Sequence, residues 1–302
     1  MKNFIQSHRV TLAAVLLLVL AFVVYSLASD ASKMDMSMGE HMKHLKAAQD
    51  QLKKPTIVPP KFNVSLGKPD MITPGASTTI DFTVYDAKTG DQVTKFDIIS
   101  DKLMHLIVVN DALTYFDHIH PVFDGKKFSV THKFPKADSY RLYTDFQPRG
   151  AEETQVGFKV IAGAPTASAK PFDRSPFDSS LSRKFGAYNV ALSGSFKATD
   201  IVSGASPFVF TITDAKTGKP VTDLRTYLGA FGHMVMINTD TLSYIHVHPM
   251  TTDLSTGMAG PEVRFQPMGL GGTTVYPGTY RVFAQFQPTS GLFTSDFIID
   301  IK

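Results

Sequence analysis

The chain has 302 residues, 43% of them hydrophobic, which is enough to fill the cores of two ordinary domains. The formal net charge is only +3, and no long Lys/Arg run occurs, so a nucleic-acid partner is not expected. Cysteine is absent, which excludes disulfides, thiolate metal sites, cysteine nucleophiles and a lipid anchor on cysteine.

The first predicted element is an uncharged segment, TLAAVLLLVLAFVVYSLA, at residues 11–28, preceded by Lys2 and Arg9. Its length suits a membrane-spanning helix and exceeds the usual apolar core of a signal peptide. The end of this segment, SLA, also suits a signal peptidase, so residues 1–29 are interpreted as an anchor, with a cleaved signal as the alternative. Either way, the positive flank stays inside and the rest of the chain is expected outside the cytoplasm, facing the periplasm or cell exterior.

A Met- and His-rich tail and linker follow at residues 30–60, with the segment KMDMSMGEHMKH at residues 33–44. Methionine at this density has no core to fill there, and thioethers are soft ligands that suit Cu(I). Flexible Met-rich segments also bind hydrophobic partners. We predict copper binding by the tail residues Met34, Met36, Met38, His41, Met42 and His44.

Two β-rich blocks, at residues 61–162 and 182–302 with a linker at 163–181, are repeats of each other. DFTVYDAKTGDQVT at residues 81–94 aligns without gaps to VFTITDAKTGKPVT at 209–222, and YRLYTDFQP at 140–148 matches YRVFAQFQP at 280–288. Each block contains short segments rich in β-branched and aromatic residues, separated by Gly, Asp, Asn and Pro. This pattern predicts an all-β fold of two tandem Ig-like antiparallel β-sandwich domains.

The repeat places three histidines at matching positions in each copy. Two residues in a His-x-His sequence on a strand point to the same face. A two-residue turn at 111–112 would place the histidine of the preceding strand directly opposite, and a turn at 239–240 would do the same in the second copy. Such triads resemble the His₃ sites that bind zinc or copper. The predicted ligands are His105, His118 and His120, and in the second copy His233, His246 and His248.

A simpler interpretation is also open, because a His-x-His pair on a strand is often a partly exposed polar face. Asp117 could add a carboxylate ligand, but its counterpart is Ile245, so it cannot be essential to a shared site. Met234 and Met236 alternate with the histidine of their strand and are expected in the core. His132 has no clear counterpart and is expected at the surface.

At MHLIVVNDALTYFDHIHP, residues 104–121, the sequence resembles the extracytoplasmic β-sandwich domains that bacteria carry among copper and heavy-metal resistance functions. The resemblance extends to YRLYTDFQP and to the matching segments of the second copy, which departs from it where Gly232 replaces Met104. The Met-rich tail is similar to those of periplasmic copper carriers. The resemblance implies metal handling outside the cytoplasm.

Two functional hypotheses follow. The first is a membrane-tethered or exported protein that sequesters or delivers copper, as Cu(I) in the tail and as Cu(II), or zinc in its place, at the histidines. The alternative is an envelope module whose tandem Ig-like domains bind a partner protein and have no metal role. An enzyme is not expected, because the sequence shows no Ser/His/Asp order, paired carboxylates or glycine-rich phosphate loop.

Overall fold

The computed structural model describes residues 60–164, 180–204, 206–247, 249–250, 257–267 and 275–302. The chain divides into two compact units, Met1–Lys54 and Pro55–Lys302, and every described residue belongs to the second. The predicted anchor at residues 11–28 and the Met/His-rich tail lie outside the described residues. Among the residues that are described, no helix has the length and apolar character needed to span a bilayer.

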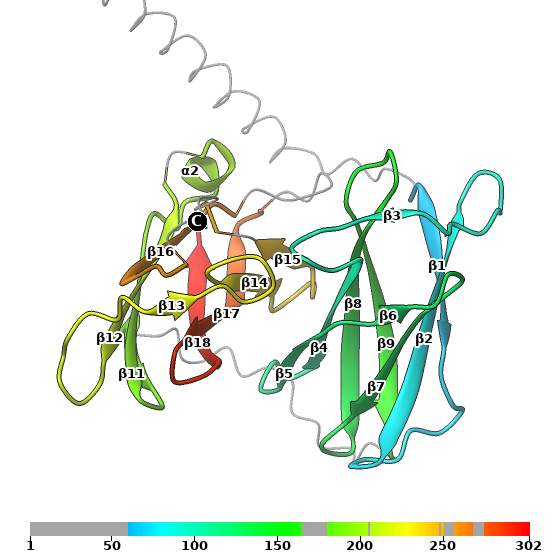
Figure 1. Cartoon of the computed structure of the whole chain (residues 1–302), viewed down its shortest axis with the longest axis horizontal. Coiled ribbons are helices and arrows are strands. Elements are labelled where there is room, and N and C mark those ends of the chain that lie inside the picture. The colour runs from blue at the N-terminus through cyan, green and yellow to red at the C-terminus, as the bar shows by residue number, and fades with distance from the viewer. Residues whose placement is uncertain (1–59, 165–179, 205, 248, 251–256, 268–274) are drawn as a thin grey trace, which may run out of the picture. The chain divides into compact units, whose positions relative to one another are not determined.

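The first domain consists of two antiparallel sheets that pack face to face (Figure 1). One sheet has the order β1-β2-β7-β6, and the other has the order β3-β8-β4-β5, with β9 also paired to β8. The strands are β1 Phe62–Gly67, β2 Ser77–Asp86, β3 Phe96–Asp97, β4 Met104–Asn110, β5 Phe116–Ile119, β6 Val122–Phe123, β7 Phe128–Lys133, β8 Asp138–Pro148 and β9 Thr154–Ala162.

The core of this domain follows from alternation along the strands. In β2, Ile80, Phe82 and Val84 are buried while the residues between them face outward or are half-buried. These side chains join Leu106 and Val108 of β4 in one hydrophobic cluster between the two sheets. A strand turns successive side chains to opposite faces, so each sheet places one set of residues in this core.

The second domain repeats the architecture, with one sheet of order β10-β11-β12-β16 and one of order β13-β17-β14-β15, in which β18 also pairs with β17. A short helix, α2 at Ala198–Val202, lies between β11 and β12. The prediction of two tandem all-β sandwiches is therefore confirmed. The strands are β10 Ser182–Phe185, β11 Tyr188–Ser193, β12 Phe208–Asp214, β13 Leu224–Arg225, β14 His233–Asn238, β15 Tyr244–Val247, β16 Glu262–Phe265, β17 Gly278–Pro288 and β18 Phe293–Ile301.

Strands β4 and β14 are buried along their whole length, on both faces. One face of β4 lies in the core of its own sandwich, whereas Ile107 and Val109 on the other face belong to a second cluster. That cluster also contains Val235 and Ile237 of β14, so the outer faces of the two sheets pack against each other. Burial on both faces explains why MHLIVV is an unbroken apolar run with one histidine in it.

Two aromatic stacks hold this interface together. Phe116 of β5 stacks on Phe283 of β17 with ring centroids 4.5 Å apart, and Tyr244 of β15 stacks on Tyr143 of β8 at 4.7 Å. The Tyr143 hydroxyl also donates a hydrogen bond to the carbonyl oxygen of Leu242 at 2.8 Å. Each domain thus contributes one ring, from β5 or β15, to the long central strand of the other domain, a reciprocal arrangement of the kind found in two-fold symmetric dimers.

Candidate metal centre

The histidines of the first copy stand on the β4–β5 hairpin, in a register that differs from the predicted one. Ile107 pairs with His118, whereas the predicted two-residue turn would have paired His105 with His118. In the second copy Val235 pairs with His246, which is the same displacement. The turn prediction was wrong by two residues in each hairpin. An even displacement leaves every side chain on its original face, so the histidines still share a face.

The longer loop has a local cause in the residue that ends each first strand. The Asn110 side-chain oxygen accepts hydrogen bonds from the backbone N–H groups of Thr114 at 2.8 Å and Tyr115 at 2.9 Å. In the second copy the Asn238 side-chain oxygen accepts from Asp240 and Thr241, both at 3.0 Å. An asparagine that bonds the backbone beyond it stabilises a loop in place of a tight turn.

Three imidazoles of the first domain converge at the end of this hairpin. His105 Nδ1 lies 3.0 Å from His118 Nε2, and His120 Nε2 lies 3.3 Å from the same His118 atom. One nitrogen from each ring lies within 4.8 Å of the other two. Nitrogen ligands held about 2.05 Å from a tetrahedral metal ion are about 3.3 Å apart, so this cluster could hold a metal ion.

Hydrogen bonds on the outer side of two rings decide where their protons lie. His105 Nε2 is 2.9 Å from the carbonyl oxygen of Ile99, which can only accept, so this nitrogen carries the proton. His118 Nδ1 is 3.0 Å from Gln285 Oε1, and Gln285 Nε2 donates to Thr294 Oγ1 at 3.3 Å, which is consistent with that amide orientation. The inward nitrogens of His105 and His118 are therefore the unprotonated ones, and a cation between them would favour their close approach.

A proton is a poor candidate for that cation. Burial lowers the pKa of His105, and burial together with the neighbouring imidazoles holds the pKa of His118 well below its usual range. Burial, reinforced by His105 and Lys102, lowers the pKa of His120 to about 3. All three rings are therefore neutral near pH 7, which is the form that binds a metal ion.

The second domain orients its histidines in the same way. His233 Nε2 donates to the carbonyl oxygen of Tyr227 at 2.8 Å, six residues earlier, as His105 does with the carbonyl six residues before it. His246 Nδ1 donates to Asp145 Oδ2 at 2.8 Å. Asp145 and Gln285 occupy matching positions on β8 and β17, so each domain holds a histidine of the other. An outer acceptor that fixes the ring and its tautomer is a regular feature of metal-ligating histidine.

These orientations bring three histidines of the first domain and two of the second into one cluster. The His118 ring centroid lies 5.4 Å from that of His233 and 5.4 Å from that of His246. The His105 and His246 centroids are 5.3 Å apart, and those of His233 and His246 are 5.6 Å apart. The structure thus gathers His105, His118, His120, His233 and His246. The other predicted ligands, His248 and the six tail residues, lie outside the described residues.

Asp145 is a participant that the sequence did not reveal. Its carboxylate is fully buried, and Oδ2 accepts hydrogen bonds from the Tyr244 hydroxyl at 2.5 Å and from His246. Burial raises the pKa of Asp145 well above its usual range, which the Tyr244 hydrogen bond opposes. A buried carboxylate is costly unless positive charge lies nearby, and a cation on the adjoining imidazoles would provide it. The available signal was one acidic residue at alternate spacing within the apolar YRLYTDF strand.

The neighbouring residues have roles of their own. Met234 and Met236 are fully buried and alternate with the interface residue Val235, which agrees with the expectation that they pack in the core. His132 is buried, with 5% of its surface exposed, so the surface expectation was wrong. Its Nδ1 lies 3.5 Å from Asp117 Oδ2, and burial lowers the pKa of the ring, so His132 meets this carboxylate mainly as a neutral imidazole.

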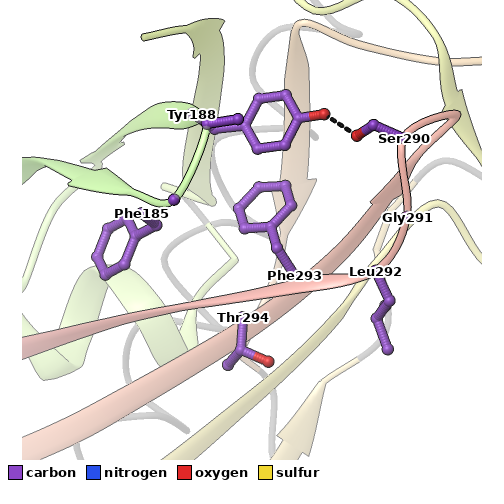
Figure 2. Close-up of a pocket in the computed structure, with 9 residues that line it drawn as sticks. Phe185, Tyr188, Ser290, Gly291, Leu292, Phe293 and Thr294 are labelled. Atoms are coloured by element: carbon purple, nitrogen blue, oxygen red, sulfur yellow. Dashed lines mark hydrogen bonds between the residues drawn. The ribbon is translucent and has the colours of Figure 1, made fainter.

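A separate hollow lies in the second domain, between the β10–β11 turn and the start of β18. It has a volume of about 330 Å³ and is lined by residues 185–188 and 290–294. Figure 2 shows the Tyr188 and Phe293 rings side by side and the Tyr188 hydroxyl directed at Ser290, to which it is hydrogen-bonded. The lining contains no imidazole or carboxylate, so it offers no chemistry comparable to that of the histidine cluster.

Comparisons with curated proteins and solved structures show little similarity to this chain. No curated protein matches it. Three solved structures align at low similarity: a two-domain fibronectin type-III segment of chicken tenascin (9% identity, 78% of this chain and 97% of that one, TM-score 0.22), a Corynebacterium diphtheriae protein described as membrane anchored (9%, 79% and 57%, 0.22) and red sea bream transglutaminase (11%, 84% and 33%, 0.21). TM-scores this low carry no argument about fold or function.

A family match covers most of the chain. The model of one family matches residues 59–163 and residues 183–302, which correspond to the two sandwiches. The linker between them and the N-terminal segment lie outside the match. The chain therefore belongs to the family described as "Domain of unknown function (DUF8832)".

Proposed function

We propose that this protein binds a transition-metal ion, copper by preference and zinc as the alternative, through the imidazoles of its first domain. The observation that carries the proposal is the approach of His105 Nδ1 and His118 Nε2 to 3.0 Å while the other nitrogen of each ring is committed to an outer acceptor. Imidazole nitrogen suits both Cu(II) and Zn(II), and divalent copper forms the stronger complexes with such ligands.

The cellular setting belongs to the same proposal. The apolar segment at residues 11–28 would tether the Ig-like sandwiches to the membrane on the extracytoplasmic side. There the Met-rich tail would bind Cu(I) and the histidine cluster would bind Cu(II), so that the protein sequesters or delivers copper. The chain has no cysteine to compete for the ion.

A competition titration tests the proposal. The metal-free full-length chain is titrated with Cu(II) and Zn(II) against a chromophoric chelator, and we expect a dissociation constant below about 1 μM, a binding free energy beyond about −8 kcal/mol. His105→Ala combined with His120→Ala should remove this binding. His132→Ala, a change at a buried histidine outside the cluster, is the matched control and should leave it intact. Equal affinity in all three proteins would leave only an envelope interaction module.

A further inference from the structure

We propose that the two domains share one metal centre, in which His233 and His246 of the second domain join the three imidazoles of the first to bind a single ion. The inference rests on the proposed function and adds to it the ligands, the stoichiometry and the role of the ion at the domain interface. Two copies of the histidine motif would otherwise suggest two separate sites and two ions per chain.

Ring spacing is the first argument for one shared centre. Imidazoles bound to one ion at a metal–nitrogen distance of about 2.05 Å have centroids about 5 Å apart. Within the first domain the centroids of His105, His118 and His120 are 4.8–5.3 Å apart. Across the interface, His118 is 5.4 Å from both His233 and His246. His105 is 5.3 Å from His246 and 6.1 Å from His233, so three of these four separations between the domains are nearly the same as the separations within the first domain.

Reciprocal support is the second argument. Gln285 of the second domain orients His118 of the first, and Asp145 of the first orients His246 of the second. Neither sandwich alone holds its own His-x-His strand in this way, because the acceptor for that strand comes from the other domain. The site is therefore complete only when the two domains are packed together.

Charge is the third argument. An imidazole that binds a metal ion through its lone pair brings no charge of its own, so a divalent ion keeps its full charge, and a buried site tolerates that charge better with an anion nearby. Asp145 is fully buried and bonded to His246. It lies on the first domain yet bonds a ligand from the second, so an ionised carboxylate there would balance the charge of the ion at the junction of the two.

The apolar interface makes the shared centre preorganised. Four aromatic rings stack in pairs across the interface, and the side chains of β4 and β14 on that face are buried. Domains held by such a surface do not need the ion in order to meet. The ion binds to an arrangement that already exists and stabilises the packed form by mass action.

Stoichiometry and ligand count test the inference on the full-length chain, with the tail methionines and tail histidines substituted by serine to remove their contribution. Cu(II) is titrated into the metal-free protein, bound copper per chain is measured, and electron paramagnetic resonance reports the nitrogen ligands. We expect one ion per chain. His233→Ala and His246→Ala should each weaken binding at least 10-fold and change the nitrogen hyperfine pattern.

A second variant protects the test from misfolding. His246→Gln retains a donor for Asp145 and should keep the metal-free fold while weakening binding as His246→Ala does. Two ions per chain would overturn the shared centre, and so would one ion that binds with the same affinity after substitution of His233 and of His246. Either result would still be compatible with a metal site in the first domain. No binding to the wild-type chain would overturn the proposed function as well.

Discussion

The two sheet faces that meet at the interface carry matching aromatic, aliphatic and imidazole side chains but differ in the residue that holds the facing histidine. Gln285 of the second domain accepts from His118 at 3.0 Å, and Asp145 of the first accepts from His246 at 2.8 Å. Both acceptors fix the ring at hydrogen-bonding distance. A neutral amide is thus sufficient to orient the imidazole, and what the carboxylate adds is charge.

The difference extends to the adjoining strands. Phe146 pairs with Thr154 in the first domain and Phe286 with Phe293 in the second, so Glu153 corresponds to Leu292. Burial raises the pKa of Glu153 to about 7, and its charge in turn raises that of Asp145. The first domain therefore concentrates carboxylates beside the histidine cluster, whereas the second has none at the two matching positions.

The largest predicted effect is a loss of stability, and it is expected at the aromatic stacks that both interface faces share. Phe283→Ala removes a ring that stacks on Phe116 within the buried interface. We expect the free energy of unfolding to fall by about 3 kcal/mol, as for other large-to-small changes at buried aromatic positions. Urea denaturation measures it, with Phe293→Ala, a change at a stacked ring away from the interface, as control. An unchanged midpoint would show that the domains do not depend on this contact.

The second prediction concerns Asp145, the position at which the two interface faces differ. Asp145→Asn makes the first domain resemble the second, keeps an acceptor for His246 and removes the charge. We expect metal affinity to fall about 10- to 100-fold, the range typical of outer partners of metal-bound histidine. Competition titration at constant pH measures this change. Wild-type affinity in the variant would mean that the carboxylate serves the fold alone.

The pH dependence of stability tests the second carboxylate. Because the pKa of Glu153 is raised to about 7 from a usual 4.5, the folded state holds a proton that the unfolded state releases, and stability falls as pH rises from about 4.5 to about 7. Glu153→Gln should remove that loss, about 2 kcal/mol after allowance for partial exposure. Thermal unfolding of the metal-free protein at several pH values follows it. An identical pH profile in wild type and variant would contradict the raised pKa.

The smallest effect is expected from the reverse exchange. Gln285→Asp places a carboxylate beside His118, so metal affinity should rise about 10-fold. The metal-free protein should lose about 1 kcal/mol, because the new charge is buried without a cation. Isothermal titration and thermal unfolding of the same preparation separate the two effects. A gain in stability without metal would show that His118 is already positively charged.

The architecture could be predicted from the sequence because its signals are local. Alternation in STTIDFTVYD and the internal repeat were sufficient for two sandwiches, and the parity of a strand was sufficient to place His118 and His120 on one face. The loop length was missed because the Asn110 side chain bonds the backbone beyond the expected turn. The error of two residues kept the histidine side chains on the predicted face of the sheet, but it changed the residue that pairs with His118 across the hairpin.

The packing of the two domains against each other could not be predicted from such local signals. An apolar run such as MHLIVV shows that both faces of a strand are covered, but it does not identify what covers the second face. The contact of Ile107 and Val109 with Val235 and Ile237 joins residues more than a hundred positions apart. For the same reason Asp145 and Gln285 were not identified from the sequence, since the histidine that each one holds belongs to the other domain.

Depth within the interface governs how fast a captured ion could leave. His105 and His118 have 0% and 5% of their surface exposed, whereas His120, just beyond β5, is half-buried. An incoming chelator or acceptor protein would therefore meet His120 before the two buried ligands. Dissociation would then be slow in plain buffer and faster when a competing ligand attacks from that side, a kinetic behaviour that suits retention of the ion until a recipient arrives.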